Sequence, residues 1–340
     1  RELMAKTAAV ADTESGNKIM NLVRREIGQV LALASLVVIF GIFSILRPVF
    51  YSWQNVSAIL MSTTVVGMLA LGVTFVIITG GIDLSIGTSV ALVAVTVGLV
   101  VVKWNGPFWL GFVVGIFVGA FIGFVNGVLI TALRLPPFIA TLATMKATQG
   151  LALIVTPNMA PINFTGTKAE GWTKIAQGNL IPNFPNGALW LIFAAIIAAI
   201  ILNKTIIGRY TFAIGSNEEA TKLSGVKVNR WLILIYTICG AYVGLAAIIL
   251  IARLGAAQPD LGLGYELEAI AAVIIGGTSL LGGKGTISGT MIGALIMAVL
   301  VNGLRILQIQ QEWQYVVVGV VIIIAVFGDN VRRRRAGDIS

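Results

Sequence analysis

The chain has 340 residues, of which 57% are hydrophobic and 11% are charged, and its formal net charge is +9. Because a soluble domain carries about 25% charged residues, this composition excludes an ordinary water-soluble protein and predicts an all-α polytopic membrane protein. Histidine is absent and Cys239 is the only cysteine, which excludes intrachain disulfides, Cys/His zinc sites, catalytic triads and histidine proton relays.

Residues 1–26 form a charged segment that precedes the first apolar run. Apolar side chains alternate with Lys18, Arg24 and Arg25 in its second half, so we predict a cytoplasmic tail with an amphipathic helix on the membrane surface. The long charged tail and the lack of a small-residue cleavage site predict that no signal peptide is removed.

Residues 27–330 form the predicted membrane domain. A helix needs about 20 mainly apolar residues to cross a bilayer, and ten segments meet this requirement. Only glycine-rich links separate the second span from the third and the eighth from the ninth. The spans are predicted at 27–46, 56–79, 84–102, 108–131, 137–155, 187–203, 231–252, 266–281, 286–304 and 313–328.

The distribution of Lys and Arg sets the orientation. Ten spans put both termini on one side, and that side carries most of the cations, including those of the basic tail 331–340. The positive-inside rule therefore predicts that both termini are cytoplasmic. Loop 156–186 is then external and loop 203–230 internal. Five tryptophans near the outer boundaries predict an aromatic belt, or alternatively a sugar-stacking mouth: Trp53, Trp104, Trp109, Trp172 and Trp190.

A short polar helix is predicted within the internal loop. Ser216 suits the N-cap position and Glu219 completes a capping box. Glu218 and Lys222 have the spacing of a stabilising ion pair, and Gly225 stands where a helix commonly ends. About eight residues are too few for a helix that is stable alone in water, so it requires a neighbouring surface.

Polar residues at the ends of spans are candidates for a pathway or gate. Asp83, in the motif Gly80–Gly87, is expected to cap the next helix; gating or sugar binding is the alternative. Asn126, Gln149 and Asn302 are pathway candidates too, and bonding between packed helices is the alternative for both asparagines. The Asn-Gly steps at 126 and 302 occupy matching places in spans 1–5 and 6–10, which suggests an inverted repeat.

Two further motifs lie around the eighth span. Glu266 and Glu268 are expected in its first turn at the outer surface, where they complement the helix dipole or meet a docking partner or gate. The segment Gly276–Gly285 contains Gly283-Lys284 but departs from the spacing of a phosphate-binding loop. We predict a tight inner turn there, with no bound cofactor or metal.

Several motifs together resemble the permease subunits of bacterial monosaccharide ABC importers, above all the ribose-type branch. The resemblance extends from about 48 to 330. It is carried by GGIDLSIG at 80–87, the segment 208–228, AAQP at 256–259, the segment 264–285 and Asn302-Gly303. It implies a location in the bacterial inner membrane, a second permease copy, a sugar-binding protein outside, and a cytoplasmic ATPase with two nucleotide-binding modules that holds ATP and Mg²⁺.

The resemblance identifies the short internal helix as the element that docks into the ATPase. Its apolar side, Ala220 and Leu223, would then be covered by another subunit, whereas a helix lying on the membrane surface is the alternative. The residues expected in this coupling helix are Ser216, Asn217, Glu218, Glu219, Ala220, Lys222, Leu223, Ser224 and Gly225.

The expected function is therefore transport of a monosaccharide, with ATP hydrolysis left to the partner, and nucleic-acid binding is not expected. The main alternative is an ion-coupled secondary sugar transporter, which commonly places carboxylates or histidines well inside its spans. A membrane enzyme is the third hypothesis, and the lack of histidine weighs against it.

Overall fold

The structure is a computed structural model that describes residues 29–164 and 166–336. The amphipathic helix expected before residue 27 and the end of the basic tail lie outside these residues. The fold is all-α, as predicted. Within the described part of the chain, nine helices are long and apolar enough to cross a membrane: Gln29–Leu46, Trp53–Ile78, Ile86–Lys103, Phe108–Ala132, Pro137–Val155, Asn186–Lys204, Val228–Leu254, Ile287–Ile306 and Gln311–Gly328.

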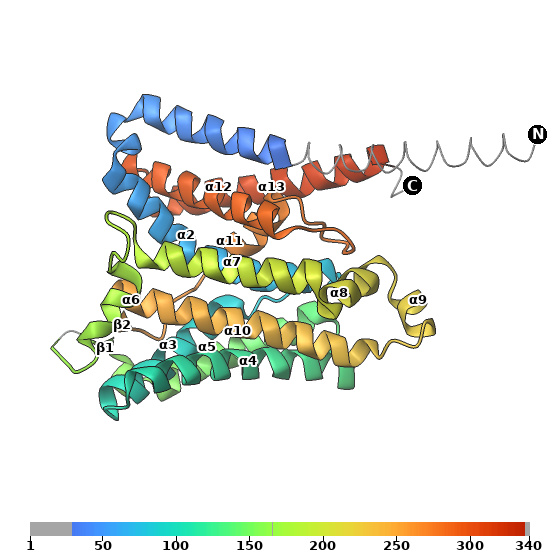
Figure 1. The fold of residues 1–340 in the computed structure, drawn as a ribbon, viewed down its shortest axis with the longest axis horizontal. Coiled ribbons are helices and arrows are strands. Elements are labelled where there is room, and N and C mark those ends of the chain that lie inside the picture. The colour runs from blue at the N-terminus through green and yellow to red at the C-terminus, as the bar shows by residue number, and fades with distance from the viewer. Residues whose placement is uncertain (1–28, 165, 337–340) are drawn as a thin grey trace, which may run out of the picture.

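The long helices run side by side (Figure 1). After the unlabelled helix Gln29–Leu46 the elements are α2 (Trp53–Ile78), α3 (Ile86–Gly98), α4 (Phe108–Ala132), α5 (Pro137–Val155), β1 (Ile162–Asn163), α6 (Thr173–Gln177), α7 (Asn186–Lys204), α8 (Ile206–Ser216), α9 (Glu218–Leu223), α10 (Val228–Leu254), β2 (Ala256–Ala257), α11 (Tyr265–Ile275), α12 (Ile287–Ile306) and α13 (Gln311–Ala336).

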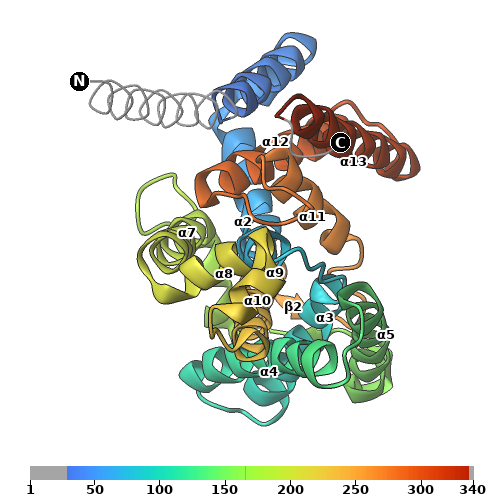
Figure 2. The same cartoon turned by 90° about the vertical axis from the view of Figure 1, so that its right-hand side faces the viewer.

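Helix α2 lies in the middle of the molecule, with α7, α10, α11 and α12 around it (Figure 2). Every residue from Val65 to Ile78 is buried, and this stretch is apolar almost all round. A helix without a polar face is typical of a core position, so α2 is the element on which the rest of the subunit packs.

Helices α4 and α10 cross at close range because glycines meet there. A Cβ placed on Gly119 or Gly123 of α4 would collide with backbone atoms of α10, and one on Gly240 or Gly244 would collide with α4. The small-residue pattern of α4 therefore acts in helix packing, as expected for membrane helices.

The eighth predicted span differs from the prediction. Helix α11 has 11 residues, or about 16 Å at 1.5 Å per residue, which is about half of a bilayer core. The chain before it is irregular, with positive φ at Gly255, Gly262 and Gly264, and Gly277 ends it with φ +88°. The apolar run 266–281 is thus interrupted by glycines rather than continuous.

The outer loop also has more structure than expected. Strands β1 and β2 pair antiparallel, and Trp172 is fully buried against Phe108, Phe112 and Phe164. The assignment of Trp172 to an interfacial belt or sugar-stacking mouth was therefore wrong, since this indole fixes the loop to α4.

Candidate pathway and coupling sites

Two interrupted segments meet inside the subunit. Residues 79–85 break the chain between α2 and α3, and residues 255–264 break it between α10 and α11. These breaks occupy matching places in the two predicted halves. The N-terminal ends of α3 and α11 meet, because a Cβ on Gly87 would collide with the Glu266 carboxylate and with the carbonyl oxygen of Gly262. Matching breaks in two halves are typical of the substrate region of membrane transporters.

Asp83 fixes the first break. Its Oδ1 accepts hydrogen bonds from the backbone N–H of Ser85 at 2.9 Å and from the Ser85 hydroxyl at 2.6 Å. Asn126 of α4 donates its Nδ2 to the carboxylate at 3.3 Å and to Ser85 Oγ at 2.9 Å. The Asp83 carboxylate thus satisfies the orphan N–H ahead of α3, as in the capping interpretation.

Asp83 and Asn126 are both buried, with 2% and 0% of their surfaces exposed. Burial raises the pKa of the Asp83 carboxyl above its ordinary value, and the hydrogen bonds from Ser85 and Asn126 oppose that rise. Within one subunit these two residues hold the linker to α4 and do not face an open channel.

Helix α5 completes the attachment of this linker. The Thr141 hydroxyl lies 2.9 Å from the carbonyl oxygen of Pro137 in its own helix and 3.2 Å from that of Ile82, so it shares its proton between α5 and the linker. The hydroxyls of Thr88 and Thr148 lie 2.8 Å apart. The linker and the start of α3 are therefore bonded to α4 and to α5, which makes this region a rigid unit.

The opposite side of α5 carries an exposed lysine and a half-buried glutamine. Gln149 accepts a hydrogen bond from Lys146 at 3.2 Å, and Lys146 is exposed although it lies in the middle of the helix. A charged side chain halfway along a spanning helix faces water or another protein surface, because contact with lipid is costly. Lys146 was not among the predicted site residues, although a lysine within an apolar run is a recognisable signal of a functional position in a membrane protein.

The remaining pathway candidate, Asn302, lies apart from this group on α12. Its side-chain Oδ1 is buried and has no hydrogen-bond partner among the described residues. The structure therefore brings Asp83 and Asn126 into one network, pairs Gln149 with Lys146 on α5, and leaves Asn302 on a separate helix.

Glu266 and Glu268 lie in the first turn of α11, as predicted, but Glu266 is not at the outer rim. Its carboxylate accepts the N–H of Gly264 at 3.1 Å and lies against the start of α3. Glu268 lies within the electrostatic reach of Arg305 at the end of α12. Glu266 therefore caps a recessed half-helix, and an outer docking role does not suit that position.

The short internal helix exists as α9, with one correction to its start. Asn217, not Ser216, is the N-cap: its Oδ1 accepts the N–H of Ala220 at 2.9 Å. Ser216 is instead the last residue of α8, a helix that the sequence analysis missed. The Glu218–Lys222 ion pair is present at 2.5 Å.

The end of α9 and its apolar side follow the prediction. Gly225 has φ +83°, a conformation that glycine adopts without a Cβ penalty. Thr221 anchors the inner side of the helix, while Ala220 is exposed and Leu223 is 89% exposed. Helix α9 projects beyond the ends of the long helices (Figure 1), so its apolar side is open to a partner.

Comparison with known proteins supports one family. A family model described as the permease component of a branched-chain amino acid transport system matches residues 55–326. The ribose import permease of Escherichia coli is 42% identical over 304 residues, covering 88% of this chain and 92% of that protein. The Bacillus subtilis ribose import permease is 44% identical over 308 residues, covering 91% and 94%.

A fructose import permease from Rhizobium meliloti is more distant. It is 36% identical over 308 residues, which cover 87% of this chain and 83% of that protein. No solved structure matches this chain. The similarity therefore extends over nearly the whole membrane domain and includes both interrupted segments and the short internal helix.

Proposed function

The chain belongs to the family of branched-chain amino acid transport system permease components, and we propose that it is the membrane-spanning permease subunit of an ATP-driven importer of a monosaccharide. Its similar relatives import ribose and fructose. Ribose is the first substrate to test, because the ribose permeases share more identity with this chain than the fructose permease does.

The observation that carries the proposal is the open apolar side of α9. A six-residue helix is not stable through its own hydrogen bonds, yet this one is capped at both ends and leaves the Leu223 side chain exposed. We propose that a cytoplasmic ATPase with two nucleotide-binding modules receives α9 and supplies ATP and Mg²⁺. This chain then transmits force and binds no cofactor.

The orientation of the subunit in the membrane follows from the distribution of Lys and Arg. Gly283 lies against the end of α2 beside α8, so the segment 255–283 crosses the membrane as one interrupted span in addition to the nine long helices. With α9 on the cytoplasmic side, both termini are then cytoplasmic and the loop that contains β1 faces outward. A sugar-binding protein outside then delivers the substrate. The protein would reside in a bacterial inner membrane.

A second permease copy completes the pathway in this proposal. The exposed Lys146 and the half-buried Gln149 place polar groups on one side of α5, whereas the exposed sides of α4 and α7 are apolar. Two copies that face each other across α5 would enclose a polar route, lined by Gln149 and Lys146, between the rigid units around Asp83 and Asn126.

Transport in proteoliposomes tests this function. The permease, its ATPase and its binding protein are reconstituted with labelled ribose, with and without ATP, and with an ionophore that dissipates proton and sodium gradients. We expect uptake to require ATP and to be unaffected by the ionophore. Uptake that collapses with the ion gradient while ATP is plentiful would instead establish an ion-coupled secondary transporter.

A further inference from the structure

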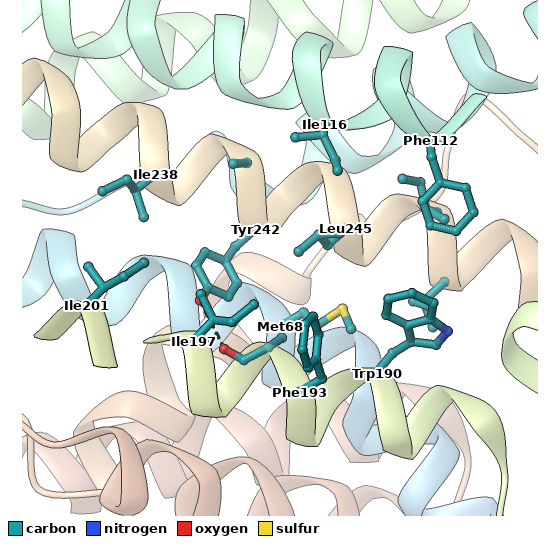
Figure 3. A pocket seen from close by; sticks show the side chains of 14 residues that line it. Met68, Phe112, Ile116, Trp190, Phe193, Ile197, Ile201, Ile238, Tyr242 and Leu245 are labelled. Atoms are coloured by element: carbon teal, nitrogen blue, oxygen red, sulfur yellow. Dashed lines mark hydrogen bonds between the residues drawn. The ribbon is translucent and has the colours of Figure 1, made fainter. Parts of the chain in front are cut away.

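An apolar slot opens between α7 and α10 (Figure 3), and α5 lies on the other side of α10 (Figure 2). Its volume is about 260 Å³. Phe112 and Trp190 lie at one end, and Ile201 and Ile238 lie at the other. From Trp190 to Ile201 the slot follows α7 for about 16 Å at 1.5 Å per residue, which suits an extended hydrocarbon chain.

The slot opens on an apolar surface of the subunit, of the kind that faces lipid. Helix α4 contains no ionisable residue, and α7 contains only Lys204, at its end. Large apolar side chains such as Phe117 and Phe193 are exposed on these helices. Among the described residues, the one side-chain hydrogen bond across the slot joins the Tyr242 hydroxyl to the carbonyl oxygen of Ala194 at 3.0 Å, so the lining offers few groups that a sugar could bind.

A second, basic hollow lies next to the slot towards α9. It has a volume of about 480 Å³ and lies between α8 and α10, with Lys227 and Arg230 in its wall. Neither cation has an ion pair in the part of the chain that the structure describes. Tyr210 and Trp231 pack against each other in its wall, with ring centroids 4.7 Å apart and planes tilted by 55°. Tyr and Trp side chains are enriched at the depth of the lipid headgroups.

The two hollows follow one stripe of α10. Leu234 lines the basic hollow and Ile238 lines the slot. These residues are four apart, so they share a face of the helix one turn from each other. The basic hollow and the apolar slot therefore lie one helical turn apart along the same face of α10.

We propose that this composite groove binds one anionic phospholipid of the inner leaflet. The phosphate lies near Lys227 and Arg230, and one acyl chain enters the slot between α7 and α10 from the end at Ile201 and Ile238. Basic pockets between spanning helices on the cytoplasmic side suit such headgroups. This inference rests on the proposed orientation of the subunit but not on which sugar is carried.

The site has a consequence for coupling, because Ser224 and Gly225, which end α9, also line the basic hollow. Helices α7 and α10 flank the segment that contains α8 and α9. A lipid wedged between them would fix the position of α9 relative to the membrane. We therefore expect ATP-driven activity to depend on anionic lipid.

Native mass spectrometry of the assembled importer tests the site. We expect one phosphatidylglycerol molecule to be retained per permease copy in preference to phosphatidylcholine. Since each cation near the surface strengthens binding of an anionic lipid roughly five-fold, the variant Lys227→Gln/Arg230→Gln should bind phosphatidylglycerol about 30-fold more weakly. Arg134→Gln, which changes an exposed cation of the α4–α5 link, is the matched control and should bind normally.

A second variant tests the slot separately. Ala241→Phe fills it and should displace the lipid, whereas Ile196→Phe on the exposed side of α7 should not. Equal retention of both lipids by the unmodified importer, or full retention by both site variants, would overturn the proposal. A structure of the assembled importer in which the ATPase, and not a lipid, occupies the basic hollow would also overturn it. Lipid retention is measured without transport, so its failure is distinguishable from failure of sugar import.

Discussion

Replacing Leu223 by Asp should weaken the attachment of the ATPase. The side chain is 89% exposed in the subunit, and full burial of a leucine contributes about 1.5–3 kcal/mol. Covering this side chain on docking therefore contributes about 1–3 kcal/mol, and a carboxylate at the same place adds a desolvation cost. We expect the dissociation constant of the permease–ATPase pair to rise at least ten-fold, with normal membrane insertion.

The measurement is binding of the purified ATPase to the permease in nanodiscs, together with stimulated ATP hydrolysis. Leu180→Asp is the matched control, since Leu180 is 81% exposed but lies in the outer loop. It should leave both quantities unchanged. Wild-type affinity and normal stimulated hydrolysis in Leu223→Asp would refute the coupling role of α9.

Three further substitutions test the packing and the candidate pathway. Gly123→Val should lower the unfolding free energy by about 1–3 kcal/mol, because its Cβ meets backbone of α10, whereas Gly150→Ala, with open space around it, should unfold normally in the same denaturant titration. Asn126→Leu removes a hydrogen-bond donor from buried Asp83 and should lower the unfolding free energy by about 1–3 kcal/mol. An unchanged denaturant midpoint of unfolding would contradict the hydrogen-bond network around Asp83. Gly215→Ala should leave ATPase binding intact but reduce ribose uptake, since a Cβ there collides with the last carbonyl of α2; normal uptake per ATP would exclude this contact as a coupling route.

The sequence predicted the class of the fold because composition alone is decisive in a membrane chain. It also predicted α9, since the Glu218–Lys222 pair and Gly225 are local signals that tertiary contacts did not override. The start of α9 was wrong by one residue because Ser216 and Asn217 are both good N-caps. In the structure α8 extends through Ser216, and Gly215 packs against the end of α2, so Asn217 is the first residue free to cap α9.

Other features depend on distant contacts, and the local sequence signals only part of them. The hydropathy of 266–281 is that of a spanning helix, and only the glycines around it mark the break. The burial of Trp172 requires three phenylalanines from α4 and the outer loop. The role of Asp83 was predicted in part, because an acceptor ahead of a helix is a local pattern, whereas its bonds to Asn126 join residues 43 positions apart.

The contacts of α8 connect the two candidate sites through a short physical route. Gly215, two residues before the N-cap of α9, packs against the carbonyl of Ile78, and that same carbonyl accepts the N–H of Gly283 at 2.8 Å. Ile78 ends α2, and the linker that follows carries Asp83. Because glycine allows backbone contact here, α8 cannot shift without moving the end of α2 or losing this contact. A push on α9 would therefore reach the rigid unit around Asp83 through backbone atoms, without a chain of flexible side chains.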